Sequence, residues 1–238
     1  MATMTLNTLV DQLRAVYGTE LVAVVLYGSA ARGEHLEKHS DLNVLVVVQR
    51  IGIEQLRREA PVAQAWREAG NPPPLTLTRA EWLGSADIFP MEYADILAHH
   101  KVLAGALPLD GVRVDMRDFR LQLEHEAMSK LLRLRHAVLT AGSDVAAQRE
   151  LLERSVSTML VLVRATLRLV GEEPAADSEA ACARATACTG VDLASVVRVV
   201  RHLRSKQVMT KDEVPVVLEQ YLATVGSLTS YIDAHVMH

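Results

Sequence analysis

Two apolar runs near the start of this sequence flank a segment that begins with a Gly-Ser pair and ends with an Asp-x-Asn triplet. The side chains of these two motifs could act together on phosphate groups. Eleven residues separate Ser29, which follows Gly28, from Asp41, which is followed by Leu42 and Asn43. Glycine permits close backbone approach, so N–H groups at this turn and the Ser29 hydroxyl could bind an anion. Oxygen atoms of Asp41 and Asn43 could hold Mg²⁺ beside that anion. The spacing therefore predicts chemistry on a nucleotide's phosphates; the alternative is a tight turn followed by a capping Asp.

Two more side chains are candidates for this site. Arg32 follows Ser29 by one helical turn, where its guanidinium could contact the same anion, although it could equally be a solvated surface charge. Residues 89–97 fit a strand, on which Glu92 and Asp95 would face opposite ways. The face of Glu92 is the less bulky one, so we expect Glu92 to complete a metal site or to act as a general base. We expect Asp95 to be a capped or paired structural acid.

The elements that must position these residues follow from the hydrophobic pattern, which changes near residue 115. Before that point the pattern mixes strands with helices, and after it the pattern is helical, which predicts an α/β or α+β domain over 1–115 and a helical bundle over 116–238. Alternation in the second strand places Asp41 and Asn43 on one face and an all-apolar set on the other, which must pack on helices. We expect strands at 21–26, 42–48, 75–78 and 89–97, and helices at 6–17, 53–68 (interrupted at Pro61), 119–140, 146–170, 179–187, 193–203 and 214–235.

The composition of the chain argues against several classes of partner and site. The formal net charge of −4 provides no broad cationic surface, so long DNA or RNA is not an expected partner. The two cysteines, Cys182 and Cys188, lack the spacing of a disulfide framework or a zinc site. No apolar run approaches the roughly 20 residues that span a bilayer, and the first residues lack the pattern of a signal peptide. We therefore expect a cytoplasmic protein without a membrane partner.

The run VVLYGSAARGEHLEKHSDLNVLVVV resembles the signature of the nucleotidyltransferase superfamily related to DNA polymerase β. In that signature an apolar strand, Gly-Ser, a short helix and an Asp-x-Asp or Asp-x-Glu strand follow in order. With its helical second half, the chain is similar to aminoglycoside nucleotidyltransferases and to minimal nucleotidyltransferases that pair with HEPN proteins. The resemblance implies a mixed sheet flanked by helices, Mg²⁺ dependence, and transfer of a nucleoside monophosphate from a triphosphate, with ATP as the expected donor. Gly28 and Ser29 would hold the triphosphate, and Asp41 would be a metal ligand.

Position 43 departs from the family pattern, which has a second acid there. Asn43 can coordinate through its amide oxygen but brings no charge, which weakens the binding of a divalent pair. Two hypotheses therefore stay open. One is an enzyme that uses Asp41, Asn43 and Glu92 to transfer a nucleotide to a hydroxyl of an unknown small molecule or protein. The other is a nucleotide-binding or regulatory module, antitoxin-like or a sensor, with weak or no catalysis.

The helical half offers fewer candidates. Residues 146–170 and 214–235 are rich in Val, Leu and Ala, which is typical of a bundle core or of a self-association surface, so a homodimer through this half is an expected partner. Arg120 and His125 have the Arg-x4-His spacing of the RNA-cleaving motif of HEPN domains. Chance produces a pattern of two residue types easily, and charges on such a helix are usually a solvated face.

Overall fold

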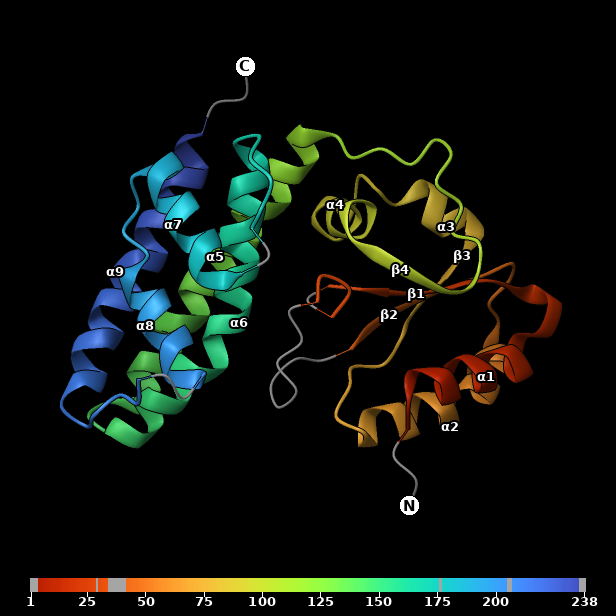
Figure 1. The fold of residues 1–238 in the computed structure, drawn as a ribbon, viewed down its shortest axis with the longest axis horizontal. Helices are drawn as coiled ribbons and strands as arrows, with labels where there is room; N and C mark the ends of the chain where they lie inside the picture. Colours follow the sequence, from red (N-terminus) through yellow and green to blue (C-terminus); the bar gives the residue numbers. More distant parts are fainter. Residues whose placement is uncertain (1–3, 29, 34–41, 176, 205–206, 236–238) are drawn as a thin grey trace. The chain divides into compact units, whose positions relative to one another are not determined.

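The computed structural model describes residues 4–28, 30–33, 42–175, 177–204 and 207–235. The chain divides into two compact units, Met1–Asp115 and Met116–His238. The first unit contains a sheet with helices, and the second is built from helices (Figure 1). The described residues thus form an α+β unit followed by a helical unit.

A mixed four-stranded sheet in the order β3-β2-β1-β4 forms the centre of the first unit. The central strand β1 pairs antiparallel with both β2 and β4, whereas β2 pairs parallel with β3. The strand bounds are Leu21–Tyr27 for β1, Asn43–Val48 for β2, Leu75–Thr78 for β3 and His100–Gly105 for β4. The expected mixed sheet is confirmed.

Helices cover both faces of this sheet (Figure 1). On one face, Val44, Val46 and Val48 of β2 belong to a core with side chains of α1, Leu6–Tyr17, and α2, Ile53–Glu68. A short 3₁₀ turn, η1, Gly18–Glu20, joins α1 to β1. On the other face, Leu45 and Val47 form a core with side chains of α3, Arg79–Gly84, and α4, Pro90–Ala98. Asn43 precedes Leu45 in the same alternation, so it lies on the α3–α4 face.

Two sequence expectations for this unit are wrong. Helix α2 runs through Pro61 without an interruption, because Val62 and Trp66 beyond it are buried in the core and packing offsets the cost of proline. Residues 89–97 form the helix α4 instead of a strand, with Pro90 in its first turn, where a missing N–H is tolerated. The strand that pairs with β1 on that side is β4, which begins after α4 ends.

The second unit is a bundle in which α6 packs against α5, α7, α8 and α9. Their bounds are Met116–Ala141 for α5, Val145–Leu169 for α6, Ser178–Thr189 for α7, Ala194–Leu203 for α8 and Glu213–Ala234 for α9. The apolar residues of α6 and α9 are largely buried, so they form the bundle core. The expected helical bundle is confirmed. Within the described parts of the chain, no helix has the length and apolar character needed to cross a membrane.

Candidate active site at the edge of the sheet

A tight turn follows β1 where the strand leaves the sheet. Gly28 has a φ of 77°, a left-handed conformation that glycine adopts without the steric cost of a side chain. Its carbonyl oxygen accepts hydrogen bonds from the N–H groups of Ala31 at 3.1 Å and Arg32 at 3.3 Å. Ser29 lies outside the described residues. Gly28 thus begins a compact turn at this edge of the sheet.

The Gly28 turn lies against the first residue of β2. A Cβ atom added to Gly28 would lie 3.0 Å from Nδ2 of Asn43, so there is room for glycine and little more. The strand register explains this proximity, because Tyr27, the last residue of β1, pairs with Asn43. Asp41 lies outside the described residues; its neighbour Leu42 donates its N–H to Oδ1 of Asn71 at 3.0 Å. The structure therefore brings Gly28 and Asn43 together.

Helix α4 carries the two acids expected near this site. Because 89–97 is helical, Glu92 and Asp95 are three residues apart on one side of a helix, and the expectation that they face opposite ways is wrong. Glu92 is exposed in the first turn of α4. The buried residues of α4, Pro90, Met91, Tyr93 and Ile96, attach the helix to the unit. The helix thus presents Glu92 to solvent and Asp95 to its neighbours.

Asp95 forms an ion pair with Arg32, at 2.7 Å between Oδ1 and a terminal guanidinium nitrogen. The side chains are 9% and 20% exposed for Arg32 and Asp95 respectively, so water screens this pair poorly. Asp95 is the paired acid that the sequence indicates. Binding of Arg32 to a phosphate stays a prediction, since the contact in the structure is with a carboxylate. The ion pair fastens the Gly28 turn to α4.

Tyr27 also lies at this edge, and the sequence motif assigns it no role. It pairs with Asn43 on β2 and with His100 on β4, so the three residues lie side by side across the sheet. Burial raises the pKa of the Tyr27 phenol, and the negative charges of Glu92 and Asp95 raise it further. The phenol therefore stays protonated, in a negative field. Only the register of three strands reveals this residue, and the sequence does not fix that register.

His100 anchors the start of β4. Its Nδ1 donates to the carbonyl oxygen of Ile96 at 2.7 Å, which fixes the ring against the last turns of α4. His99 precedes it, and its Nδ1 atom is buried. His100 is half-buried beside Tyr27, its partner on β1.

The donors for a metal ion at this edge are of two kinds. Asn43 could supply an amide oxygen and Glu92 a carboxylate, and both are oxygen ligands suited to Mg²⁺. Within the ranges that the structure describes, no three His, Cys, Asp or Glu side chains group closely enough to hold a metal. A complete Mg²⁺ site would thus depend on Asp41, whose position is outside those ranges.

The second candidate pair, Arg120 and His125, has a structural explanation. The Arg120 guanidinium donates to the carbonyl oxygens of Asp233 at 2.7 Å and His235 at 2.8 Å, and it pairs with Glu124 at 3.2 Å. A cationic side chain at the last carbonyls of a helix satisfies groups that lack partners within the helix. Arg120 therefore holds the end of α9, while the side chain of His125 is exposed.

Comparisons with known proteins bear on the fold. No protein-family model matches the chain, and no curated protein matches it. Among solved structures, a spectinomycin adenyltransferase from Enterococcus faecialis, crystallised with ATP and spectinomycin, is similar with a TM-score of 0.59 and 13% sequence identity. The likeness covers 96% of this chain and 100% of that one. This chain has a nucleotidyltransferase-like fold. The fold agrees with the resemblance of its Gly-Ser and Asp-x-Asn segment to the superfamily signature.

Proposed function

We propose that this nucleotidyltransferase-like protein transfers a nucleoside monophosphate from a triphosphate, with ATP as the donor, to a hydroxyl group of an acceptor. The observation that carries the proposal is the contact between the Gly28 turn and Asn43, since it joins the two halves of the motif at one edge of the sheet. The fold supports it, because the similar solved structure is an adenyltransferase that was crystallised with ATP.

Each candidate residue has a role in this proposal. Backbone N–H groups after Gly28 and the hydroxyl of Ser29 would bind the triphosphate. Asp41, Asn43 and Glu92 would hold Mg²⁺, which when bound neutralises charge on the phosphates. Alternatively, Glu92 would act as the general base and accept the proton of the acceptor hydroxyl, since it is exposed on α4 and its charge acts on Tyr27. Arg32, fastened to Asp95, would position the turn and extend its charge toward the phosphates.

The charge of this edge favours a particular class of acceptor. Glu92 and Asp95 both raise the pKa of Tyr27, which means that their negative charges act on this edge together. Because Arg32 offsets the charge of Asp95, we expect the carboxylate of Glu92 to attract a small cationic molecule with hydroxyl groups. The acceptor of the similar structure is spectinomycin, so this compound is the first acceptor to assay. A protein acceptor is the alternative substrate class.

The second candidate function is nucleotide binding without rapid turnover, as in a sensor or an antitoxin-like module. Asn43 favours it, because an amide replaces the second acid of the signature and leaves the metal site with less negative charge. The Gly28 turn would still bind phosphate in such a module. The two candidates share one nucleotide site and differ in whether pyrophosphate is released.

Transfer of label from the α-phosphate tests the proposal. The protein is incubated with α-labelled ATP, Mg²⁺ and spectinomycin or a pool of metabolites and proteins, and incorporation is compared with that of Asp41→Ala. We expect a loss of roughly 100-fold or more, because a metal ligand contributes several kcal/mol to the transition state. The matched control is Asp11→Ala, which removes an exposed carboxylate on α1.

Three results would speak against transfer of the nucleotide at this site. Transfer that survives in Asp41→Ala would show that the site is elsewhere. Mg²⁺-dependent ATP binding without release of pyrophosphate would support the binding module instead. Label arriving from the γ-phosphate would indicate a kinase.

A further inference from the structure

Helix α5 carries apolar side chains on a face that the bundle does not bury. Leu121, Met128, Leu132 and Leu139 are 65%, 44%, 55% and 82% exposed, respectively. Spacings of seven, four and seven residues place all four on one side of the helix. We call these four residues the outer stripe. The buried face of α5 is formed by a different set: Phe119, Leu123, Ala127, Leu131 and Leu134.

The four residues of the outer stripe are spaced symmetrically about position 130. Leu121 and Leu139 lie nine residues on either side of position 130, and Met128 and Leu132 lie two residues on either side. Two such helices packed antiparallel would therefore place Leu121 on Leu139 of the second copy and Met128 on Leu132. A twofold-symmetric interface uses the same patch on both subunits and so requires this self-complementarity.

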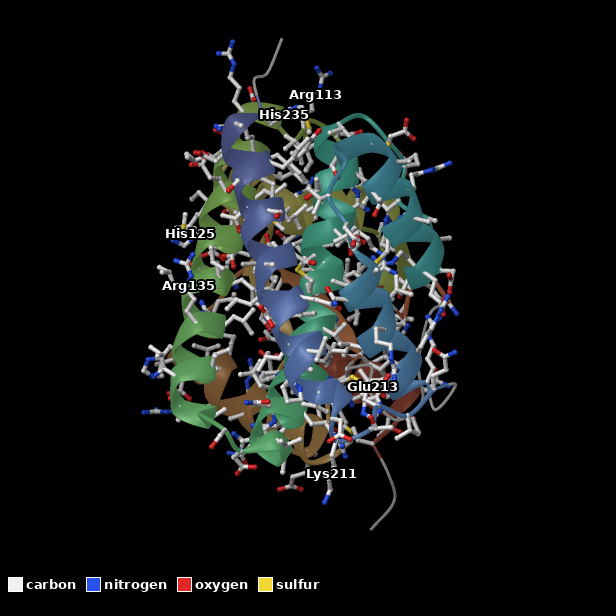
Figure 2. All side chains as sticks on the ribbon, turned by 90° about the vertical axis from the view of Figure 1, so that its left-hand side faces the viewer. Arg113, His125, Arg135, Lys211, Glu213 and His235 are labelled. Carbon is white, nitrogen blue, oxygen red and sulfur yellow. The ribbon has the colours of Figure 1, made fainter. Side chains whose placement is uncertain are left out.

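Charges beside the outer stripe favour the same arrangement. Glu124 and Arg135 lie along one edge of the stripe, six and five residues respectively from position 130 in opposite directions. Antiparallel packing brings Glu124 close to Arg135 of the second copy, twice by symmetry. Parallel packing would place this edge of the two copies on opposite sides of the seam, so Glu124 and Arg135 could not pair between copies. Figure 2 shows the labelled His125 and Arg135 along the outer side of α5, away from α9.

We propose that two copies of this chain associate antiparallel through the outer stripe of α5. The contact would extend about 27 Å, since α-helical residues rise about 1.5 Å each and the stripe spans 121 to 139. The proposal does not rest on nucleotidyl transfer.

Sedimentation of the full-length protein over a range of concentrations tests the association. We expect a dimer whose Kd rises roughly 100-fold in Leu132→Glu, because the carboxylate would be buried against apolar side chains. The matched control is Val161→Glu, which places the same charge at an exposed valine of α6, 51% exposed, and should leave Kd unchanged. A second variant, Arg135→Glu, would bring two acids together and should also weaken the dimer. A chain that stays monomeric at every concentration, or equal effects of Leu132→Glu and Val161→Glu, would overturn the proposal.

Cross-linking tests the direction of packing. Cys188 is exposed and is first replaced in Cys188→Ser, whereas Cys182 is buried and can stay. Leu121→Cys and Leu139→Cys are then made separately. Antiparallel packing predicts an interchain disulfide when the two variants are mixed and none in either variant alone. Disulfides within each single variant would show parallel packing, and no disulfide in the mixture would show that the stripe is not the interface.

Discussion

Asn43 is the residue on which the choice between enzyme and binding module depends. Its side chain lies against the Gly28 turn, and its backbone pairs with Tyr27 where β1 ends and β2 begins. A carboxylate has nearly the same size as this amide, so a substitution at position 43 can change charge without changing shape. Position 43 can therefore test the electrostatics of the edge separately from its packing.

Asn43→Asp should tighten Mg²⁺-dependent binding of ATP, on the order of tenfold, because a second charged ligand strengthens a hard-cation site. Calorimetric titration with and without Mg²⁺ measures this directly, and release of pyrophosphate measures turnover. Asn7→Asp, the same change on the exposed side of α1, serves as the control. If Asn43→Asp weakens ATP binding equally with and without Mg²⁺, position 43 does not contribute to a metal site.

At the scale of elements, α4 shows how alternation at every second residue can wrongly indicate a strand. Phe89, Met91, Tyr93 and Leu97 alternate as in a strand, yet the helix buries Pro90, Met91, Tyr93 and Ile96. An apolar run this short fits both the two-residue period of a strand and the 3.6-residue period of a helix. Proline is common at the first position of a helix, so Pro90 is the residue that indicates a helix here. The pairing of Arg32 with Asp95 joins residues 63 positions apart, and no local pattern encodes such a contact.

The helices of the second unit could be predicted because their signals, unlike those of α4, are long and unambiguous. Their patterns are long, and side chains at their ends fix the bounds: Asp144 accepts from the N–H groups of Ala146 and Ala147 at the start of α6, and Asp177 accepts from that of Ala180 at the start of α7. Gly190 ends α7 in a left-handed conformation. Such signals are local, so the sequence alone reveals them.

The two acids of α4 should differ when neutralised. Asp95→Asn leaves the poorly exposed Arg32 guanidinium without its carboxylate, which should lower the free energy of unfolding by about 2 kcal/mol. Glu92→Gln changes an exposed residue, so it should leave stability unaltered and reduce nucleotidyl transfer by about 100-fold or more. Urea denaturation and the α-phosphate assay measure the two effects. Equal losses of stability in both variants would contradict the division of roles.

At the scale of the whole molecule, buried tyrosines in both units tie stability to alkaline pH. Burial raises the pKa of Tyr93 to about 12, and it also raises the pKa values of Tyr17 in the first unit and Tyr221 in the second. The folded state therefore holds phenolic protons that the unfolded state loses near pH 10. The stability they provide is complete below about pH 10 and is lost as pH rises above it.

Urea denaturation at about pH 8 and about pH 11 should show a fall in the free energy of unfolding, with the phenolate absorbance of Tyr17, Tyr93 and Tyr221 appearing only as the protein unfolds. Tyr221→Phe should reduce this dependence on pH, although it also removes the acceptor of the Ser155 hydroxyl. Tyr231→Phe on the same helix, at a less buried ring, is the comparison. Phenolate absorbance that appears near pH 10 in folded Tyr231→Phe, at an amplitude that requires Tyr17, Tyr93 and Tyr221, would contradict the burial of these groups.

Both tryptophans of the chain, Trp66 and Trp82, lie in the first unit, one in each core beside the sheet, and both are fully buried. Indole fluorescence therefore reports on the first unit alone, while circular dichroism at helical wavelengths reports largely on the second. Two melting curves recorded on a single sample can thus follow the two units separately, and a gap between their midpoints would reveal independent unfolding.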